Sequence, residues 1–183
     1  MTSRIALLVA SFFVTVPAFA HPFHGAGDLA AGLAHPFLGL DHALAMLAIG
    51  LWASRSGARA VWAVPCAFVV AMLAGFAFAM AGLVLPAVEP MIAASVLAFG
   101  LLIVSRTQVS ASVGMLVAGA FAVSHGVAHA VEIPQYAGAL SYAAGFAVAT
   151  VALHLLGFGV GRTLNARLTG IPIALAGAWM LIA

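Results

Sequence analysis

Residues 60–84 read AVWAVPCAFVVAMLAGFAFAMAGLV and contain no charged side chain. A transmembrane α-helix needs ~20 predominantly apolar residues, so this stretch predicts a helix that crosses a bilayer. Other apolar stretches, separated by short polar breaks, occupy residues 29–54, 90–105, 109–132, 137–161 and 169–183. The stretches 90–105 and 169–183 are short for a full crossing. The pattern predicts an all-α fold, a polytopic membrane helix bundle of about six transmembrane helices, in a single domain over residues 21–183.

The composition of the chain agrees with a membrane location. Of its 183 residues, 66% are hydrophobic and only 5% are charged, whereas soluble domains carry about 25% charged residues. So few charges cannot cover a surface that faces water, which excludes a soluble enzyme; we expect a protein that is not an enzyme and that contacts the lipid bilayer. The pI is near 9.3, yet the chain has no basic cluster and no lysine. We therefore expect neither a nucleic-acid partner nor a nucleotide-binding P-loop.

The N-terminus has the three parts of a secretory signal peptide. Arg4 supplies a positive charge, residues 5–16 are apolar, and residues 17–20, PAFA, end in the small-x-small pattern that signal peptidase cleaves. Residues 1–20 are therefore expected to be removed, which leaves His21 as the mature N-terminus.

The few charged residues sort onto two sides of the bundle. Five arginines fall in the first, third and fifth breaks between apolar stretches: Arg55, Arg59, Arg106, Arg162 and Arg167. Three acids fall at the opposite ends of the stretches: Asp28, Glu89 and Glu132. Because cytoplasmic loops carry an excess of basic residues, the arginine side is predicted to be cytoplasmic and both mature termini periplasmic.

Ionisable side chains within the apolar stretches concentrate in two segments. The first, HPFLGLDH, covers residues 35–42, and the second, HGVAHAVE, covers residues 125–132. An ionisable residue inside a membrane span costs several kcal/mol and is functional by default. These two segments are therefore the candidate functional residues.

Helical spacing places donors of the second segment on one face. His125, His129 and Glu132 are separated by four and then three residues, so their side chains point the same way. Two imidazoles and a carboxylate suit a divalent transition metal.

In the first segment, His35 and His42 lie seven residues apart and are expected to share one face of a helix that begins near Pro36. Asp41 either binds a metal or accepts a hydrogen bond that holds His42. The two spans run in opposite directions, which places both segments in the outer half of the membrane, where they can meet.

Other roles for these histidines stay open on the sequence. They could form a proton relay, ligate haem as an axial pair, or be buried residues of a structural accessory subunit. His154 is either a packing residue or part of an exit path, and the methionines Met46, Met72 and Met80 are expected to pack. A homo-oligomer is compatible with the sequence, although no residue argues for one.

The segment HPFLGLDHALAM, residues 35–46, with GLWA at 50–53, resembles the signature of the HupE/UreJ family of hydrogenase- and urease-accessory proteins. The family's first motif, H-x5-D-H, is matched by His35, Asp41 and His42. Its second motif, F-H-G-x-A-H-G-x-E, is matched over residues 124–132, except that Ser124 replaces the phenylalanine and Ala130 replaces a glycine.

This resemblance implies a permease of the bacterial inner (cytoplasmic) membrane that takes up Ni²⁺ from the periplasm. Co²⁺ or Zn²⁺ is the alternative cargo, and no permanently bound cofactor is expected. Under this hypothesis the metal site and its entrance are formed by six residues: His35, Asp41, His42, His125, His129 and Glu132. His35 and Glu132 would form the outer vestibule, and the other four the dehydrated site.

Uptake of Ni²⁺ is expected to depend on pH. Metal-ligating imidazoles must be deprotonated, and an unperturbed histidine titrates near pH 6.5. Uptake should therefore fall as the external pH drops through this range, because protons then compete with the ion for the ring nitrogens. Uptake of radioactive nickel by cells that express the protein tests this, and rates that stay flat between about pH 5 and 7.5 would contradict imidazole ligation.

Overall fold

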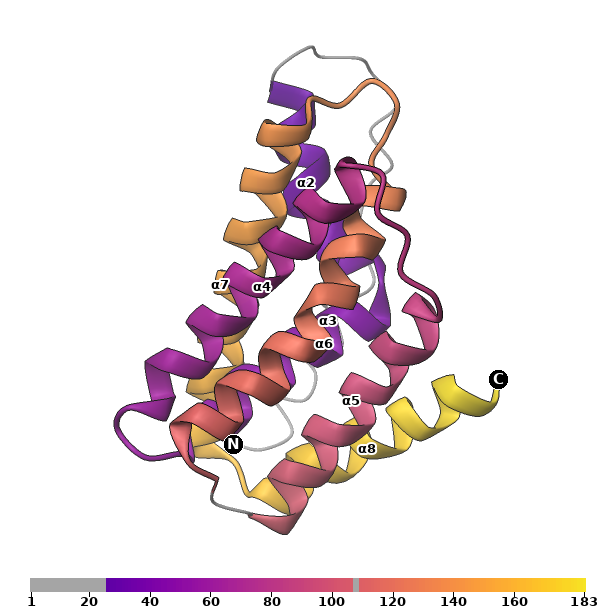
Figure 1. Cartoon of the computed structure of the whole chain (residues 1–183). Helices are drawn as coiled ribbons and strands as arrows, with labels where there is room; N and C mark the ends of the chain where they lie inside the picture. The colour runs from indigo at the N-terminus through magenta and orange to yellow at the C-terminus, as the bar shows by residue number, and fades with distance from the viewer. Residues whose placement is uncertain (1–25, 107–108) are drawn as a thin grey trace.

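The computed structural model describes residues 26–106 and 109–183, and the predicted signal peptide at residues 1–20 lies outside the described residues. Within these ranges every regular element is a helix, which confirms the all-α prediction (Figure 1). The helices are α2 (Ala26–Leu38), α3 (Leu40–Ala53), α4 (Ala60–Met80), α5 (Val88–Ser105), α6 (Ala111–Val131), α7 (Ala139–Thr163) and α8 (Ala166–Ile182).

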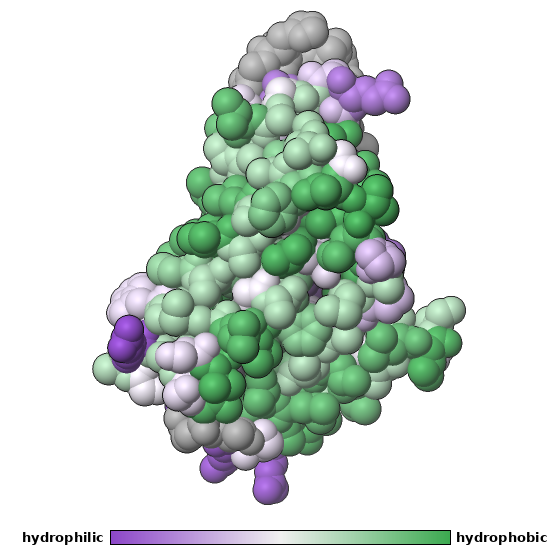
Figure 2. Space-filling model, viewed as in Figure 1, coloured by the Kyte–Doolittle hydropathy of each residue, from purple (hydrophilic) through white to green (hydrophobic). Residues whose placement is uncertain are grey.

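Several of these helices are suited to cross a membrane. Among the described residues, α4, α5, α6 and α7 are each long and apolar enough, whereas α2 and α3 pass the same test only as a pair, bent by 82°. Helix α8 has 17 residues and is shorter than a full span. Figure 2 shows apolar residues over the middle of one face and hydrophilic residues mainly toward its ends. The chain is therefore a multi-pass membrane protein, and a sixth crossing stays a prediction.

The first apolar stretch, expected as one span over residues 29–54, forms two helices. The expected helix start near Pro36 is wrong, because α2 begins at Ala26 and Pro36 lies inside its last turn. Gly39 then adopts an extended conformation, with φ −93° and ψ 113°, and α3 begins at Leu40. Proline lacks the N–H of the helical hydrogen bond and glycine disfavours a helix, so Pro36 and Gly39 together end α2.

Helices α2 and α3 both pack along α7 in direct backbone contact. A Cβ atom built on Gly32 would collide with the carbonyl oxygen of Tyr142, and one built on Gly50 would collide with that of His154. A straight helix would place Gly32 and Gly50 ~27 Å apart, whereas Tyr142 and His154 lie only ~18 Å apart along α7. The bend at Gly39 takes up the difference between these two lengths.

The remaining helices pack as two further pairs, and α5 and α8 lie side by side in Figure 1. Contacts at glycines define the directions of the helices in each pair. In the pair of α4 and α6, Val64 contacts Gly114 and Gly75 contacts Val123. In the pair of α5 and α8, Leu97 contacts Gly177 and Gly100 contacts Ala174. Helices α4 and α6 thus run parallel, as α3 and α7 do, whereas α5 and α8 run antiparallel. These are the relative directions expected if successive apolar stretches cross the membrane in alternating directions.

The close approach of α3 to α7 gives a stability prediction. Gly157→Ala would place a Cβ atom against the backbone of Leu47, and overpacking of this kind costs about 1–3 kcal/mol. The thermal midpoint of the detergent-purified variant should therefore fall. Gly159→Ala on the same helix is the control, because no atom of another described helix lies within 4 Å of its new Cβ. Equal midpoints for the two variants would contradict the contact.

Candidate metal site

Three helices bring four histidine rings together inside the bundle. His35 comes from α2, His42 from α3, and His125 and His129 from α6. Ring centroids are 4.8 Å apart for His42 and His125, 4.9 Å for His42 and His129, and 4.8 Å for His35 and His129. His125 and His129 are fully buried, and His42 is nearly so. We call these four residues the histidine cluster.

His35 and His42 do not share a helix face, contrary to the expectation from their spacing, because the break at Gly39 separates α2 from α3. Their ring centroids are nevertheless 6.0 Å apart, since each helix approaches the cluster from its own direction. In α6 the helix is continuous, and both of its histidines reach the cluster.

Two carboxylates contact the cluster. Oε2 of Glu132 lies 2.8 Å from Nε2 of His35, and Oδ1 of Asp41 lies 3.0 Å from Nδ1 of His42. The side chains of His35 and Glu132 are 20% and 45% exposed, against 5% for His42. The pair of His35 and Glu132 therefore lies at the open end of the cluster, and His42 lies deeper.

The hydrogen bonds assign the protons on two of the rings. Ser95 Oγ donates its only proton to the carbonyl oxygen of Ile92 at 2.6 Å, so at 3.0 Å it accepts from Nε2–H of His125. The Asp41 carboxylate is an acceptor, so Nδ1 of His42 carries the proton. Each ring therefore has its lone pair on the other nitrogen, Nδ1 of His125 and Nε2 of His42, and this is the form of imidazole that ligates metals.

These lone-pair nitrogens are buried without a hydrogen-bond partner. Among the described residues, no partner reaches His42 Nε2, His125 Nδ1 or either ring nitrogen of His129. Leaving a buried polar atom unpaired costs about 1–3 kcal/mol, so a group of such atoms calls for a functional explanation. Neutral imidazole nitrogen is a preferred donor for Ni²⁺, Co²⁺ and Zn²⁺, so the donor chemistry fits a divalent transition metal.

The cluster is a set of donors and not a finished coordination sphere. Within the part of the chain that the structure describes, no three His, Cys, Asp or Glu side chains are placed to hold one ion. The rings of His42 and His125 meet edge to face with an interplanar angle of 86°, and those of His42 and His129 at 67°. Binding an ion would require rotation of these side chains.

Three further residues contact the histidine cluster, and the sequence pattern did not predict them. Ser95 binds His125 as described, and Phe146 of α7 stacks on His129 with ring centroids 4.3 Å apart and planes 2° apart. Tyr142, one turn before Phe146, lies 5.7 Å from the ring of His35. The spacing of the two aromatic residues is the only signal that the sequence offers for them, and a single serine in an apolar helix offers none.

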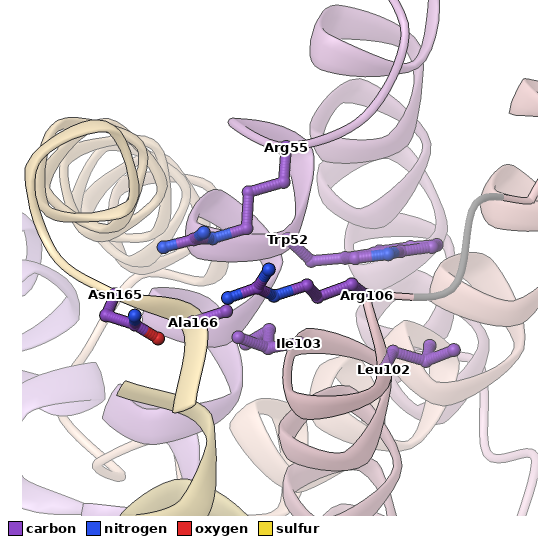
Figure 3. Close-up of a pocket in the computed structure, with 7 residues that line it drawn as sticks. All are labelled: Trp52, Arg55, Leu102, Ile103, Arg106, Asn165 and Ala166. Atoms are coloured by element: carbon purple, nitrogen blue, oxygen red, sulfur yellow. The ribbon is translucent and has the colours of Figure 1, made fainter. Parts of the chain in front are cut away.

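One cavity lies at each end of α3. One of about 330 Å³ is lined by Asp41, Glu89 and residues of the end of α8, so Glu89, expected only as a periplasmic charge, shares a cavity with Asp41. Another of about 320 Å³ lies where Arg55, Arg106 and Asn165 extend from the ends of α3 and α5 and the start of α8 (Figure 3). These arginines share one end of the bundle, as the predicted orientation requires.

Comparison with known proteins places the chain in a family. The family model described as HupE / UreJ protein matches residues 7–183. The chain belongs to the HupE/UreJ family. A relative described as Protein HupE, from Rhizobium leguminosarum bv. viciae, is 43% identical in an alignment of 188 positions that covers 98% of each chain. No solved structure matches the chain.

In this HupE/UreJ member, the two departures from the second motif lie beside the histidine cluster. Ser124 and Ala130 are both buried in α6. The potential donors of that segment are His125, His129 and Glu132, which all match the motif. The departures therefore change packing around the cluster and leave its donors in place.

The hydroxyl of Ser95 is expected to stabilise the fold through His125. Ser95→Ala would leave a second nitrogen of this buried ring without a partner, at a cost of about 1–3 kcal/mol. The thermal midpoint of the purified variant should fall, whereas Ser112→Ala, at an exposed serine of α6, should leave it unchanged. A Ser95→Ala midpoint equal to the wild-type value would show that the hydroxyl does not hold His125.

Proposed function

We propose that this protein is a nickel permease that carries Ni²⁺ from the periplasm across the bacterial inner membrane into the cytoplasm. Membership of the HupE/UreJ family and the multi-pass helix bundle support this proposal. The same donors would accept Co²⁺ or Zn²⁺, because affinity alone does not separate these ions. The nickel would serve a hydrogenase or a urease, and the protein itself would not be an enzyme.

The observation that carries the proposal is the set of lone-pair nitrogens in the histidine cluster. A structural histidine in an apolar bundle normally satisfies both ring nitrogens. Here Asp41 and Ser95 each bind one nitrogen of a ring, and the other nitrogen of the same ring has no partner among the described residues. A proton relay would need hydrogen bonds from ring to ring, and among the described residues none joins two rings of the cluster.

The proposed route begins at the open end of the cluster. Glu132 and His35 form a vestibule whose negative charge attracts a hydrated cation. The ion then exchanges water for the ring nitrogens of His42, His125 and His129. Asp41 holds Nδ1–H of His42 and so presents Nε2, a partner role that metal-binding histidines commonly have. Binding must be strong enough to remove water and weak enough to release the ion.

His129→Ala and His42→Ala are expected to abolish Ni²⁺ uptake, because each removes a ring from the centre of the cluster. Uptake is measured in proteoliposomes with a nickel-quenched fluorophore inside, after reconstitution of equal amounts of folded protein. An absorption spectrum of the same preparations tests for haem. Uptake by either alanine variant at the wild-type rate, or a haem spectrum in the wild-type protein, would contradict the proposal.

The accessory role has a separate test in cells. A strain that lacks the protein should lose hydrogenase or urease activity at low external nickel and regain it in medium with millimolar nickel, because other routes then supply the metal. Lost activity that added nickel does not restore, despite normal intracellular nickel, would indicate a structural accessory subunit instead.

A further inference from the structure

A second group of donor atoms lies deeper in the bundle than the histidine cluster. Oγ1 of Thr150 on α7 donates to Sδ of Met46 on α3 at 3.2 Å, and Sδ of Met72 on α4 lies 3.7 Å from the same oxygen. All three side chains are fully buried. Three helices therefore bring two thioether sulfurs and one hydroxyl together at one point.

The orientation of Thr150 is unusual for a threonine in a helix. Such hydroxyls generally bond to a carbonyl oxygen three or four residues earlier, as Thr163 does with Gly159 and Val160. Thr150 instead turns its hydroxyl to the sulfurs, although thioethers are weak acceptors. While the hydroxyl donates its hydrogen bond to a sulfur, its oxygen keeps two lone pairs that can face a cation.

His154 adds an imidazole one turn further along α7. It is 4% exposed, and its Nε2 has no hydrogen-bond partner within the described part of the chain. Its ring lies 5.3 Å from that of Phe68, whose other neighbour is His125 at 5.4 Å. An unpaired ring nitrogen in an apolar bundle is costly, so packing alone does not explain His154.

These residues continue the line of the histidine cluster toward the arginine end. Met46 lies one turn after His42 on α3, and Thr150 lies one turn after Phe146, which stacks on His129. His154 follows ~6 Å further along α7. Its backbone contact with Gly50 holds α3 and α7 in register there. His154 also borders a cavity of about 280 Å³ between α4 and α7.

We propose that Met46, Met72, Thr150 and His154 form an inner site that the transported ion occupies after it leaves the histidine cluster. This inference rests on the proposed function. A cation without its water needs donor atoms throughout the apolar interior, because the bilayer core supplies none. The inner site offers sulfur, hydroxyl oxygen and imidazole nitrogen, and it contains no carboxylate.

The donor types of the inner site explain both release and selectivity. Neutral donors hold a divalent ion less tightly than imidazoles with the Asp41 carboxylate beside them, so the ion can move on. Thioether and imidazole suit borderline and soft ions, whereas Mg²⁺ and Ca²⁺ prefer carboxylates, carbonyls and water. The inner site would therefore disfavour these abundant cations at a step beyond the histidine cluster.

Uptake and binding, measured separately, test the inner site. Thr150→Val and Met46→Leu keep side-chain volume but remove a donor, and His154→Leu removes the imidazole. Changes to groups that only orient metal ligands typically cost about 10–100-fold in affinity or activity, and loss of a donor should cost at least as much. Nickel uptake into proteoliposomes should therefore fall about tenfold or more, while equilibrium binding of Ni²⁺ to the purified variants, followed by calorimetry, should stay close to the wild-type value.

Conservative and matched variants serve as controls. Thr150→Ser keeps the hydroxyl and His154→Met restores a donor atom, so both should transport better than Thr150→Val and His154→Leu. Thr163→Val and Met80→Leu make the same substitutions at exposed positions and should leave uptake unchanged. Thermal midpoints identify any variant that fails to fold. If one does, the difference in uptake between Thr150→Ser and Thr150→Val decides whether the inner site is real.

The outcomes separate this inference from the proposed function. Normal uptake by folded Thr150→Val, Met46→Leu and His154→Leu would overturn the inner site and leave the permease intact. Loss of both binding and uptake in these folded variants would also overturn it, because the donors would then belong to the first site. A wild-type protein that neither binds nor transports Ni²⁺ would overturn the proposed function itself.

Discussion

The backbones of α3 and α7 touch at Gly50 and Gly157, and the positions of the candidate site residues depend on this contact. In a membrane, lipid removes most of the hydrophobic drive between helices, so close packing through small residues has to supply the association. A second such contact, at Gly32, holds α2 against the same helix. A straight helix from Gly32 to Gly50 would be longer than the segment of α7 that these two glycines contact. The break at Gly39 removes this difference in length. Because of this break, His35 on α2 and His42 on α3 reach the same cluster from different directions.

The apolar bundle makes every polar atom informative. Each buried ring with an identified partner uses one nitrogen for it: Asp41 accepts a hydrogen bond from His42, and Ser95 accepts one from His125. These hydrogen bonds fix the ring orientation and the tautomer, and they leave lone pairs buried inside the bundle. In water the same lone pairs would be solvated at little cost. In the membrane they stay costly until a cation or a proton binds them.

Negative charge is confined to the outer part of the proposed route. The open end carries Glu132 and His35, the next level carries Asp41 with three imidazoles, and the inner site consists only of neutral donors. Negative charge at the entrance favours capture of a hydrated cation, whereas neutral donors further in favour its release. A bilayer penalises buried charge most strongly at its centre, so the same gradient is compatible with stable insertion of the bundle.

The local sequence pattern was enough to predict the helices and to locate the two segments that carry the candidate donors. Uninterrupted apolar stretches required helices, since a helix satisfies its own backbone in lipid, and the spacing of His125 and His129 on α6 required a common face. The break at Gly39, the hydroxyl of Ser95 and the contact of Thr150 with two methionine sulfurs were decided only by the tertiary structure. Each depends on which small residues of one helix meet which of another, and in a chain rich in alanine and glycine many such pairings are locally equivalent. Periodicity describes one helix at a time, whereas the site is made by helices in contact.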